Sequence, residues 1–254
     1  MKEVKRAILF AVDDLLIHTN QGIPIDPKPI ALLRKIRRIW ETQLSVDAML
    51  IPESGGFLVK IRKELHPFKK RFAIAHEIGH TFFFNIEIDP PRREFQYQKS
   101  EYWVQEEFSC AIAREILVPR FSIIPLIENE HVRPSVAALR YLSALYQVSF
   151  DVLRMRLIND LPLWDCVAIV STVVDCKILT KGRDISKGKS HRSFVMPKVI
   201  EWKDKLPKLY QIISGTVSDK RIQEKIEIDN KEYLVETALL DAARQTVMTL
   251  LVYT

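Results

Sequence analysis

The chain has 254 residues, of which 47% are hydrophobic, and 38 basic against 32 acidic side chains give a formal charge of +6. This composition excludes a disordered chain, and the small numbers of glycine and proline exclude collagen-like and low-complexity sequences. No apolar run reaches the roughly 18–20 residues of a membrane span. The three cysteines lack metal-type spacing and favour a reducing cytoplasm, where we expect the protein to be located.

The N-terminal part of the chain predicts two helices followed by two strands. Residues 1–19 carry apolar side chains at helical spacing and predict a short helix. After the proline-containing segment GIPIDPKP, we expect a basic amphipathic helix that continues through Leu33 and Ile36 to Trp40. The segments SVDAMLI and GFLVKIRK, separated by a turn at residues 53–56, predict two strands.

The middle of the chain predicts helices. Residues 72–84 predict a buried helix, and residues 104–118 predict another that ends before Pro119. A further helix is expected to begin near Phe121, and residues 135–158 predict two helices joined by a short turn.

The character of the sequence changes near residue 160. The segments after this point are rich in β-branched residues, and several alternate in polarity, which predicts strands. We therefore expect an α+β protein with two domains. Residues 1–160 form a mainly helical core with a small sheet, and residues 161–254 form a small β-rich domain.

The strongest chemical signal is the segment His76-Glu77-Ile78-Gly79-His80. Helix positions four residues apart share a face, so both imidazoles can bind one Zn²⁺ while Glu77 takes a proton from a water at the metal. The flanking residues are almost all apolar, and burying two histidines and a glutamate among them is costly unless they have partners. The alternative is a pair of core histidines that are satisfied by local hydrogen bonds.

A catalytic zinc needs a third protein ligand, and the helix expected at residues 104–118 offers two adjacent acids. Glu106 shares an apolar face with Cys110 and Leu117, whereas Glu107 lies on a mixed, polar face. A carboxylate on the apolar face needs a buried partner, so Glu106 is favoured over Glu107 as the ligand. The alternative partner of Glu106 is a buried arginine or a helix end.

The segments RFAIAHEIGHTFF and EEFSCAIAREILVP resemble the ImmA/IrrE family of metallopeptidases. In that family, a helix with HExxH precedes a helix of the form E-x-x-x-N-x-x-A-x-x-x-L-x-P. Glu106, Ala113, Leu117 and Pro119 match the second pattern, and the resemblance places the third zinc ligand on Glu106. It covers about residues 22–160.

The resemblance implies a fold and a function as well as a metal site. It implies a zincin-like peptidase core that contains a helix-turn-helix-like region at about residues 121–158. Members of the family cleave repressors with helix-turn-helix domains, which activates mobile-element or stress-response genes. The expected protein is thus a zinc-dependent, site-specific endopeptidase acting on such a repressor, with Mn²⁺ as the alternative metal. Residues 161–254 take the place of a sensor-like or substrate-recognition domain, or they are a structural cap.

Two details of the predicted site stay open. The family's asparagine is replaced by Cys110, which we interpret as a small packing residue rather than one that orients a ligand. The group that polarises the scissile carbonyl is not identified, and the candidates are Arg71, Tyr97, Tyr102 and His131.

Two other functions are weighed against the endopeptidase. Residues 181–208 hold nine basic and three acidic side chains. We interpret this basic segment as a solvated loop, and nucleic-acid binding through it is not favoured. A DNA-associated regulatory protein with a vestigial or structural zinc site is the alternative, and Arg154 and Arg156 are its candidates for reading bases. The intact Glu77 argues against a purely structural site. The third hypothesis is an aminopeptidase or another general zinc peptidase. The oligomeric state is left open.

Overall fold

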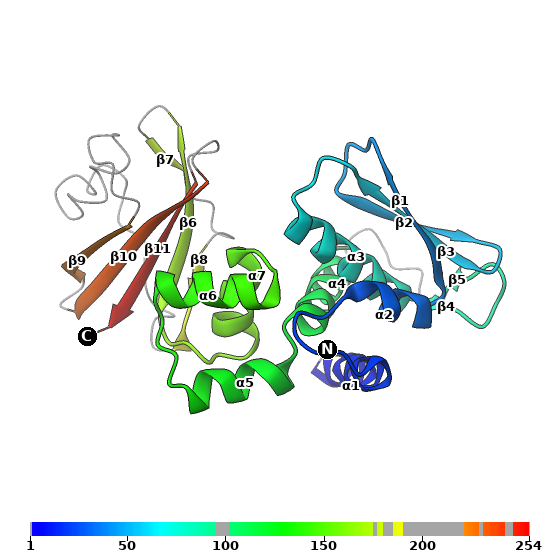
Figure 1. Ribbon diagram of the computed structural model, residues 1–254, viewed down its shortest axis with the longest axis horizontal. Coiled ribbons are helices and arrows are strands. Elements are labelled where there is room, and N and C mark those ends of the chain that lie inside the picture. Colours follow the sequence, from blue (N-terminus) through cyan, green and yellow to red (C-terminus); the bar gives the residue numbers. More distant parts are fainter. Residues whose placement is uncertain are drawn as a thin grey trace. The chain divides into compact units, whose positions relative to one another are not determined.

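The computed structural model describes residues 2–94, 102–174, 177–179, 185–189, 221–228, 231–241 and 246–253. Helices and small sheets are mixed along the chain (Figure 1), so the α+β fold class is confirmed. Within the described ranges, no helix is both long enough and apolar enough to cross a membrane.

The chain forms two compact units. Unit 1 consists of Met1–Ile123 with Leu142–Val152, and unit 2 consists of Ile124–Tyr141 with Leu153–Thr254. The domain boundary expected near residue 160 stays a prediction, because this grouping concerns compactness and not independent folding.

Unit 1 contains a three-stranded sheet. Its strands are β1 (Ile36–Thr42), β2 (Ala48–Glu53) and β3 (Gly56–Arg62), arranged in the order β1-β3-β2. The central strand β3 pairs parallel with β1 and antiparallel with β2. Its alternate residues Phe57, Val59 and Ile61 are buried, as expected for one face of a sheet packed on a core. Strand β2 is left at one edge of this sheet.

The prediction that this helix continues to Trp40 is wrong. Helix α2 (Pro27–Leu33) ends early, and Ile36 already begins strand β1. Lys35 has a φ of 58°, in the left-handed region that ends a helix, and its carbonyl accepts the N–H of Phe57 at 2.8 Å. The segment IRRIWET then pairs with β3, and this long-range pairing outweighs the helical spacing of its apolar residues.

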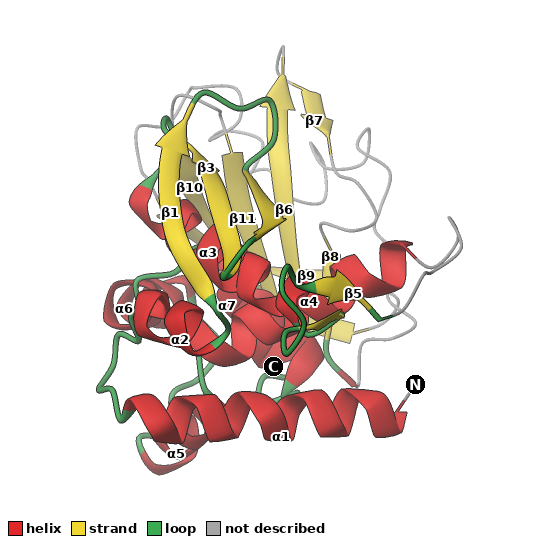
Figure 2. Cartoon of the chain, turned by 90° about the vertical axis from the view of Figure 1, so that its right-hand side faces the viewer, coloured by secondary structure: helices red, strands yellow, loops and turns green. Residues whose placement is uncertain are grey.

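Three helices complete the part of unit 1 that holds the cleft: α1 (Lys2–Thr19), α3 (Pro67–Thr81) and α4 (Tyr102–Leu117). Helix α3 packs against strands β2 and β3 and along α4, while α1 lies against α4 and is the long helix at the bottom of Figure 2. Helix α3 begins before the expected residue 72, because the ring of His66 accepts the N–H of Phe68 and Pro67 occupies the first turn. Strands β4 (Phe84–Asn85) and β5 (Arg92–Arg93) follow it as a short antiparallel pair.

Helices α3 and α4 approach each other most closely at Gly79. A Cβ atom at this position would lie 2.7 Å from the Cα and 2.9 Å from the carbonyl oxygen of Ser109. Both are backbone atoms and cannot rotate away. The glycine within the HExxH segment therefore sets the distance between the two helices.

We predict that Gly79→Ala destabilises the protein. Alanine favours a helix over glycine by about 0.8–1 kcal/mol, but overpacking a tight contact costs about 1–3 kcal/mol, so the net effect should be a loss. Chemical unfolding of the variant should show a lower midpoint. Gly22→Ala is the matched control, because nothing lies within 4 Å of a Cβ there. An unchanged midpoint for Gly79→Ala would contradict the close helix contact.

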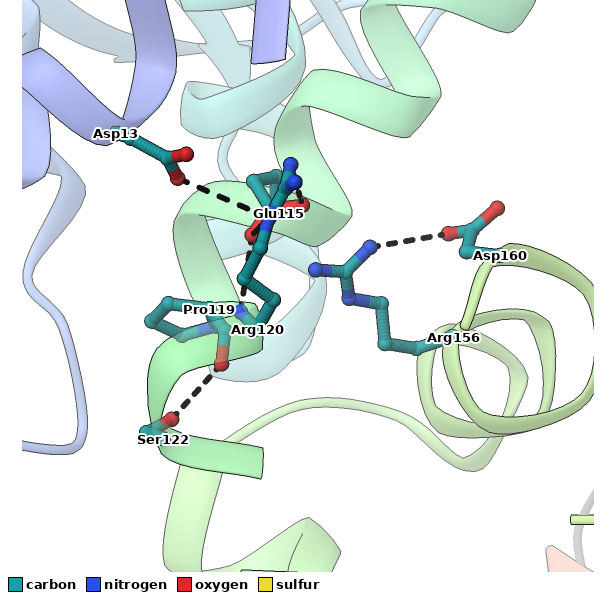
Figure 3. Close-up of polar contacts among 7 residues, drawn as sticks. All are labelled: Asp13, Glu115, Pro119, Arg120, Ser122, Arg156 and Asp160. Carbon is teal, nitrogen blue, oxygen red and sulfur yellow. Dashed lines mark hydrogen bonds and ion pairs between the residues drawn. The ribbon is translucent and has the colours of Figure 1, made fainter. Parts of the chain in front are cut away.

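A buried carboxylate fixes the junction between α4 and helix α5 (Arg120–Asn129). The Glu115 side chain is 0% exposed, and one carboxylate oxygen accepts the backbone N–H of Arg120 at 2.9 Å (Figure 3). The Arg120 guanidinium donates to both oxygens of Glu115 and lies 3.8 Å from Asp13 of α1. Glu115 thus accepts a free N–H at the start of α5, and the Arg120 guanidinium neutralises the charge of its carboxylate.

Unit 2 contains a larger sheet whose strands differ in length. Its strands are β6 (Val167–Val174), β7 (Lys177–Leu179), β8 (Ile185–Lys187), β9 (Arg221–Ile228), β10 (Lys231–Asp241) and β11 (Thr246–Tyr253). The order is β7-β6-β11-β10-β9, and β8 also pairs with β6. All described pairings are antiparallel. The β-rich character expected after residue 160 is present in the described ranges.

The two helices expected at residues 135–158 are α6 (Val136–Tyr146) and α7 (Phe150–Arg154), and a π-helix (Met155–Asp160) continues α7. Within unit 2, the buried Glu236 of β10 accepts the N–H of Val136 at 2.7 Å, so a strand side chain caps the start of α6. Of the basic segment 181–208, only residues 185–189 lie within the described ranges.

Candidate metal centre and cleft

The structure brings His76, His80 and Glu106 together. The Nε2 atoms of the two histidines, one turn apart on α3, are 3.0 Å from each other. One carboxylate oxygen of Glu106 on α4 lies 3.2 Å from Nε2 of His76, and the other lies 3.4 Å from Nε2 of His80. Two imidazole nitrogens and a carboxylate oxygen facing one point are the donor set of a three-ligand catalytic zinc, so these residues fit the metal. The neighbouring Glu107 is exposed.

The other ring nitrogens of the two histidines face helix α4. Nδ1 of His80 lies 3.1 Å from Oγ of Ser109, and Nδ1 of His76 lies 3.5 Å from Sγ of Cys110. The interpretation of Cys110 as a packing residue is therefore incomplete, because its sulfur contacts a ligand ring. Ser109 was missed by sequence reasoning, although its position three residues after Glu106 places it on the same side of the helix.

Glu77 is buried beside this cluster, with 5% of its surface exposed. Its carboxylate accepts the backbone N–H of Leu50 from strand β2, a contact that the sequence could not show. Burial raises the pKa of Glu77 to about 7; His76 opposes this increase, and the charge of Glu106 adds to it. A carboxylate with this pKa can both accept and return a proton near neutral pH.

The two histidines cannot both be protonated at this distance. Burial and the charge of His76 lower the pKa of His80 to about 4. Burial also lowers the pKa of His76, but its hydrogen bonds with Cys110 and Glu106 raise it by more, to about 10. The hydrogen bond with His76 lowers the pKa of Glu106. A metal at this cluster would compete with protonation of the His76 ring.

Arg34 fixes the end of α3 directly after His80. Its guanidinium donates to the hydroxyl of Thr81 at 3.0 Å and to the carbonyl of Thr81 at 3.1 Å, and it lies 4.3 Å from the centre of the Phe82 ring. A cation at the C-terminus of a helix satisfies its last carbonyls and complements the helix dipole. The last turn of α3, which carries His80, is thus held from outside the helix.

The ligand cluster lies at the wall of a cleft of about 740 Å³. Apolar side chains from β2, its preceding loop, α3 and β4 line much of the cleft: Val46, Ala48, Met49, Leu50, Phe72, Ala73 and Phe84. Arg93 of β5 also lines it and stacks over the ring of Phe84 at 5.2 Å. Sequence reasoning missed Arg93, because the short strand that carries it has no distinctive pattern.

The four candidate carbonyl-polarising groups are placed differently. Tyr102 lines the cleft and hydrogen-bonds to Glu106, whose charge raises the pKa of the phenol. Arg71 is not among the described lining residues, and its guanidinium donates to the carbonyl of Ile25 at 2.6 Å. His131 belongs to unit 2. Tyr97 lies outside the described residues.

Comparison with known proteins agrees with this site. Residues 51–158 match the family model described as an IrrE N-terminal-like domain, a stretch that includes His76, Glu77, His80 and Glu106. No curated protein matches the chain. A solved structure named "Mycobacterium tuberculosis transcriptional regulator" has a TM-score of 0.63 at 12% identity, covering 96% of this chain and 75% of that chain. At this identity the likeness concerns the fold alone.

The family match indicates a metallopeptidase domain, and the group His76, His80 and Glu106 is a possible metal-binding set within it. The resemblance to the ImmA/IrrE family seen in the sequence is thus confirmed over residues 51–158.

Proposed function

We propose that this protein is a zinc-dependent endopeptidase that cleaves a helix-turn-helix transcriptional repressor at a specific site. The observation that carries the activity is the convergence of His76, His80 and Glu106 beside the buried Glu77, all at one cleft. The substrate class is supported by the family, because its members cleave repressors of this kind.

The side chains of the site divide the work of hydrolysis. Bound by His76, His80 and Glu106, a zinc ion would supply Lewis acidity toward a water and the scissile carbonyl. Glu77 accepts a proton from the attacking water and passes it to the nitrogen of the leaving amine, so it ends the cycle in the state in which it began. Tyr102 and Arg93 line the cleft as donors able to stabilise negative charge on the carbonyl oxygen.

Strand β2 offers a path for the substrate main chain. It lies at the edge of its sheet, and the segment from Val46 to Leu50 lines the cleft. An extended peptide can add to such an edge by backbone hydrogen bonds while its side chains enter neighbouring pockets. Met49 and Phe72 provide apolar surface there. We infer that the substrate is cut within an extended segment rather than within an intact helix.

The DNA-binding alternative receives little support from the helices that motivated it. Arg154 and Arg156 are only 5% and 3% exposed. Arg154 donates to Oγ of Ser186 at 2.7 Å, and Arg156 lies 3.8 Å from Asp160 (Figure 3). Side chains with buried partners do not reach base edges in a groove.

A cleavage assay tests the proposed function. The zinc-loaded protein is incubated with each helix-turn-helix repressor of the same genome, and the products are identified by intact-mass spectrometry. We expect one internal cut in one repressor, lost with a zinc chelator and restored by added zinc. Failure to cut any repressor, together with sequence-specific and salt-dependent DNA binding, would favour the alternative.

A further inference from the structure

We propose that Ser109 and Cys110 are positioning residues that fix the rings of the two metal-binding histidines. Each residue takes one histidine: Ser109 holds His80, and Cys110 holds His76. The inference rests on the proposed metal site. It assigns an orienting role to two consecutive residues of α4, Ser109 and Cys110, the second of which stands where the family pattern has asparagine.

The geometry constrains each imidazole at both ends. Nε2 of each ring faces Glu106, at 3.2 Å for His76 and 3.4 Å for His80. Nδ1 of each ring faces α4, where Ser109 or Cys110 is its partner. When Nε2 of a neutral imidazole binds a metal, Nδ1 carries the hydrogen and needs an acceptor. A ring rotated by half a turn would lose both contacts.

One face of α4 supplies all three groups. Glu106, Ser109 and Cys110 lie at positions i, i+3 and i+4, which are neighbours on a helix surface. The close approach of α3 at Gly79 places the backbone of Ser109 directly against the helix that carries the histidines. The ligand and both orienting groups therefore move together as one rigid element.

The two contacts differ in strength. A hydroxyl oxygen is a good acceptor, and the buried Ser109 lies 3.1 Å from its ring. A thiol sulfur is a weak acceptor, and Cys110 lies 3.5 Å from its ring. We expect His80 to be held more firmly than His76. A stronger acceptor at position 110, as in Cys110→Asn, should therefore tighten the site.

Zinc affinity measured by competition with a chromophoric chelator is the first test. Loss of an orienting partner typically weakens metal binding by about 10–100-fold, so we expect Ser109→Ala near the upper end and Cys110→Ala near the lower end of this range. Cys110→Asn should bind at least as tightly as the original protein. Ser143→Ala and Cys166→Ala are matched controls, because both residues are buried, neither is a lining residue of the cleft, and the Ser143 hydroxyl donates to the carbonyl of Val148. Both controls should keep the original affinity.

Nitrogen-15 NMR of the histidine rings provides a readout that a merely structural role would not move. In the original protein, both rings should show the Nδ1–H tautomer in the zinc-loaded state. Ser109→Ala should shift and speed the exchange of the His80 Nδ1–H signal alone, and Cys110→Ala should do so for His76 alone. Unchanged affinity and unchanged ring signals in both variants would overturn the inference while leaving the peptidase proposal intact.

Failure of the metal site itself would look different. If the original protein binds no zinc, the proposed function fails, and the ring signals of the metal-free protein still decide whether Ser109 and Cys110 contact the histidines. Ring signals that do not respond to either substitution would then overturn the inference as well. Equal losses of affinity in the Ser143→Ala and Cys166→Ala controls would also overturn it, because the effect would follow from general destabilisation.

Discussion

Glu77→Gln should retain bound zinc and lower peptide-bond hydrolysis by at least about 10²–10⁴-fold, the usual contribution of a general acid–base group. Glutamine has nearly the same shape and can still accept the N–H of Leu50 through its carbonyl oxygen. It cannot accept a proton from the attacking water. The variant therefore removes the proton transfer and leaves the ligand set His76, His80 and Glu106 in place.

The comparison needs a rate and a metal measurement on the same preparation. Hydrolysis is followed on the repressor that the protein cuts, or on a library of proteome-derived peptides read by mass spectrometry, and zinc is measured by elemental analysis. Glu107→Gln is the matched control, since it makes the same chemical change at an exposed glutamate on the same helix as Glu106. Full activity of Glu77→Gln would contradict the proposed mechanism.

Glu106→Ala should purify without zinc, whereas Glu107→Ala should keep about one zinc per chain, the content of a single three-ligand site. The substitution removes the only one of the three donors that comes from α4 and leaves two histidines on α3. Two ligands hold zinc far more weakly than three, and hydrolysis should be lost with the metal. The Glu106 side chain is partly exposed, so its removal should not unfold the domain.

Elemental analysis of the original protein and both variants checks this result, with circular dichroism as the control for folding. Zinc lost only in Glu107→Ala would keep the peptidase proposal but show that the third ligand is Glu107 and not Glu106. Zinc absent from every preparation, even after it is added back, would contradict the metal site. It would favour the alternative of a DNA-associated regulatory protein.

The grouping of His76, His80 and Glu106 could be predicted from the sequence because its signals are local. His76 and His80 are spaced within one helix, and the apolar face of the next helix distinguishes Glu106 from Glu107. The structure brings the three predicted groups to within 4.8 Å of one another. The same reasoning cannot supply the N–H of Leu50 for Glu77, since that contact depends on how a strand packs against the helix.

Other predictions fail for the same physical reason. The spacing of apolar residues around Trp40 fits a helix, but pairing with β3 turns the segment into a strand. Arg154 and Arg156 were the base-reading candidates of the DNA-binding alternative, and the fold of unit 2 buries them with Ser186 and Asp160 as partners. Burial of a charged residue is set by tertiary contacts, which periodicity does not report.

The two compact units are interleaved along the chain, since unit 1 resumes at residues 142–152 after unit 2 has begun. No single cut separates them. Truncation after residue 160 would leave residues 124–141 without the strands of their own unit, and the N–H of Val136 would lose its buried acceptor Glu236. We expect that recombination between genes could not exchange unit 1 and unit 2 independently of each other. Proteins that evolve from this one should therefore retain both units together.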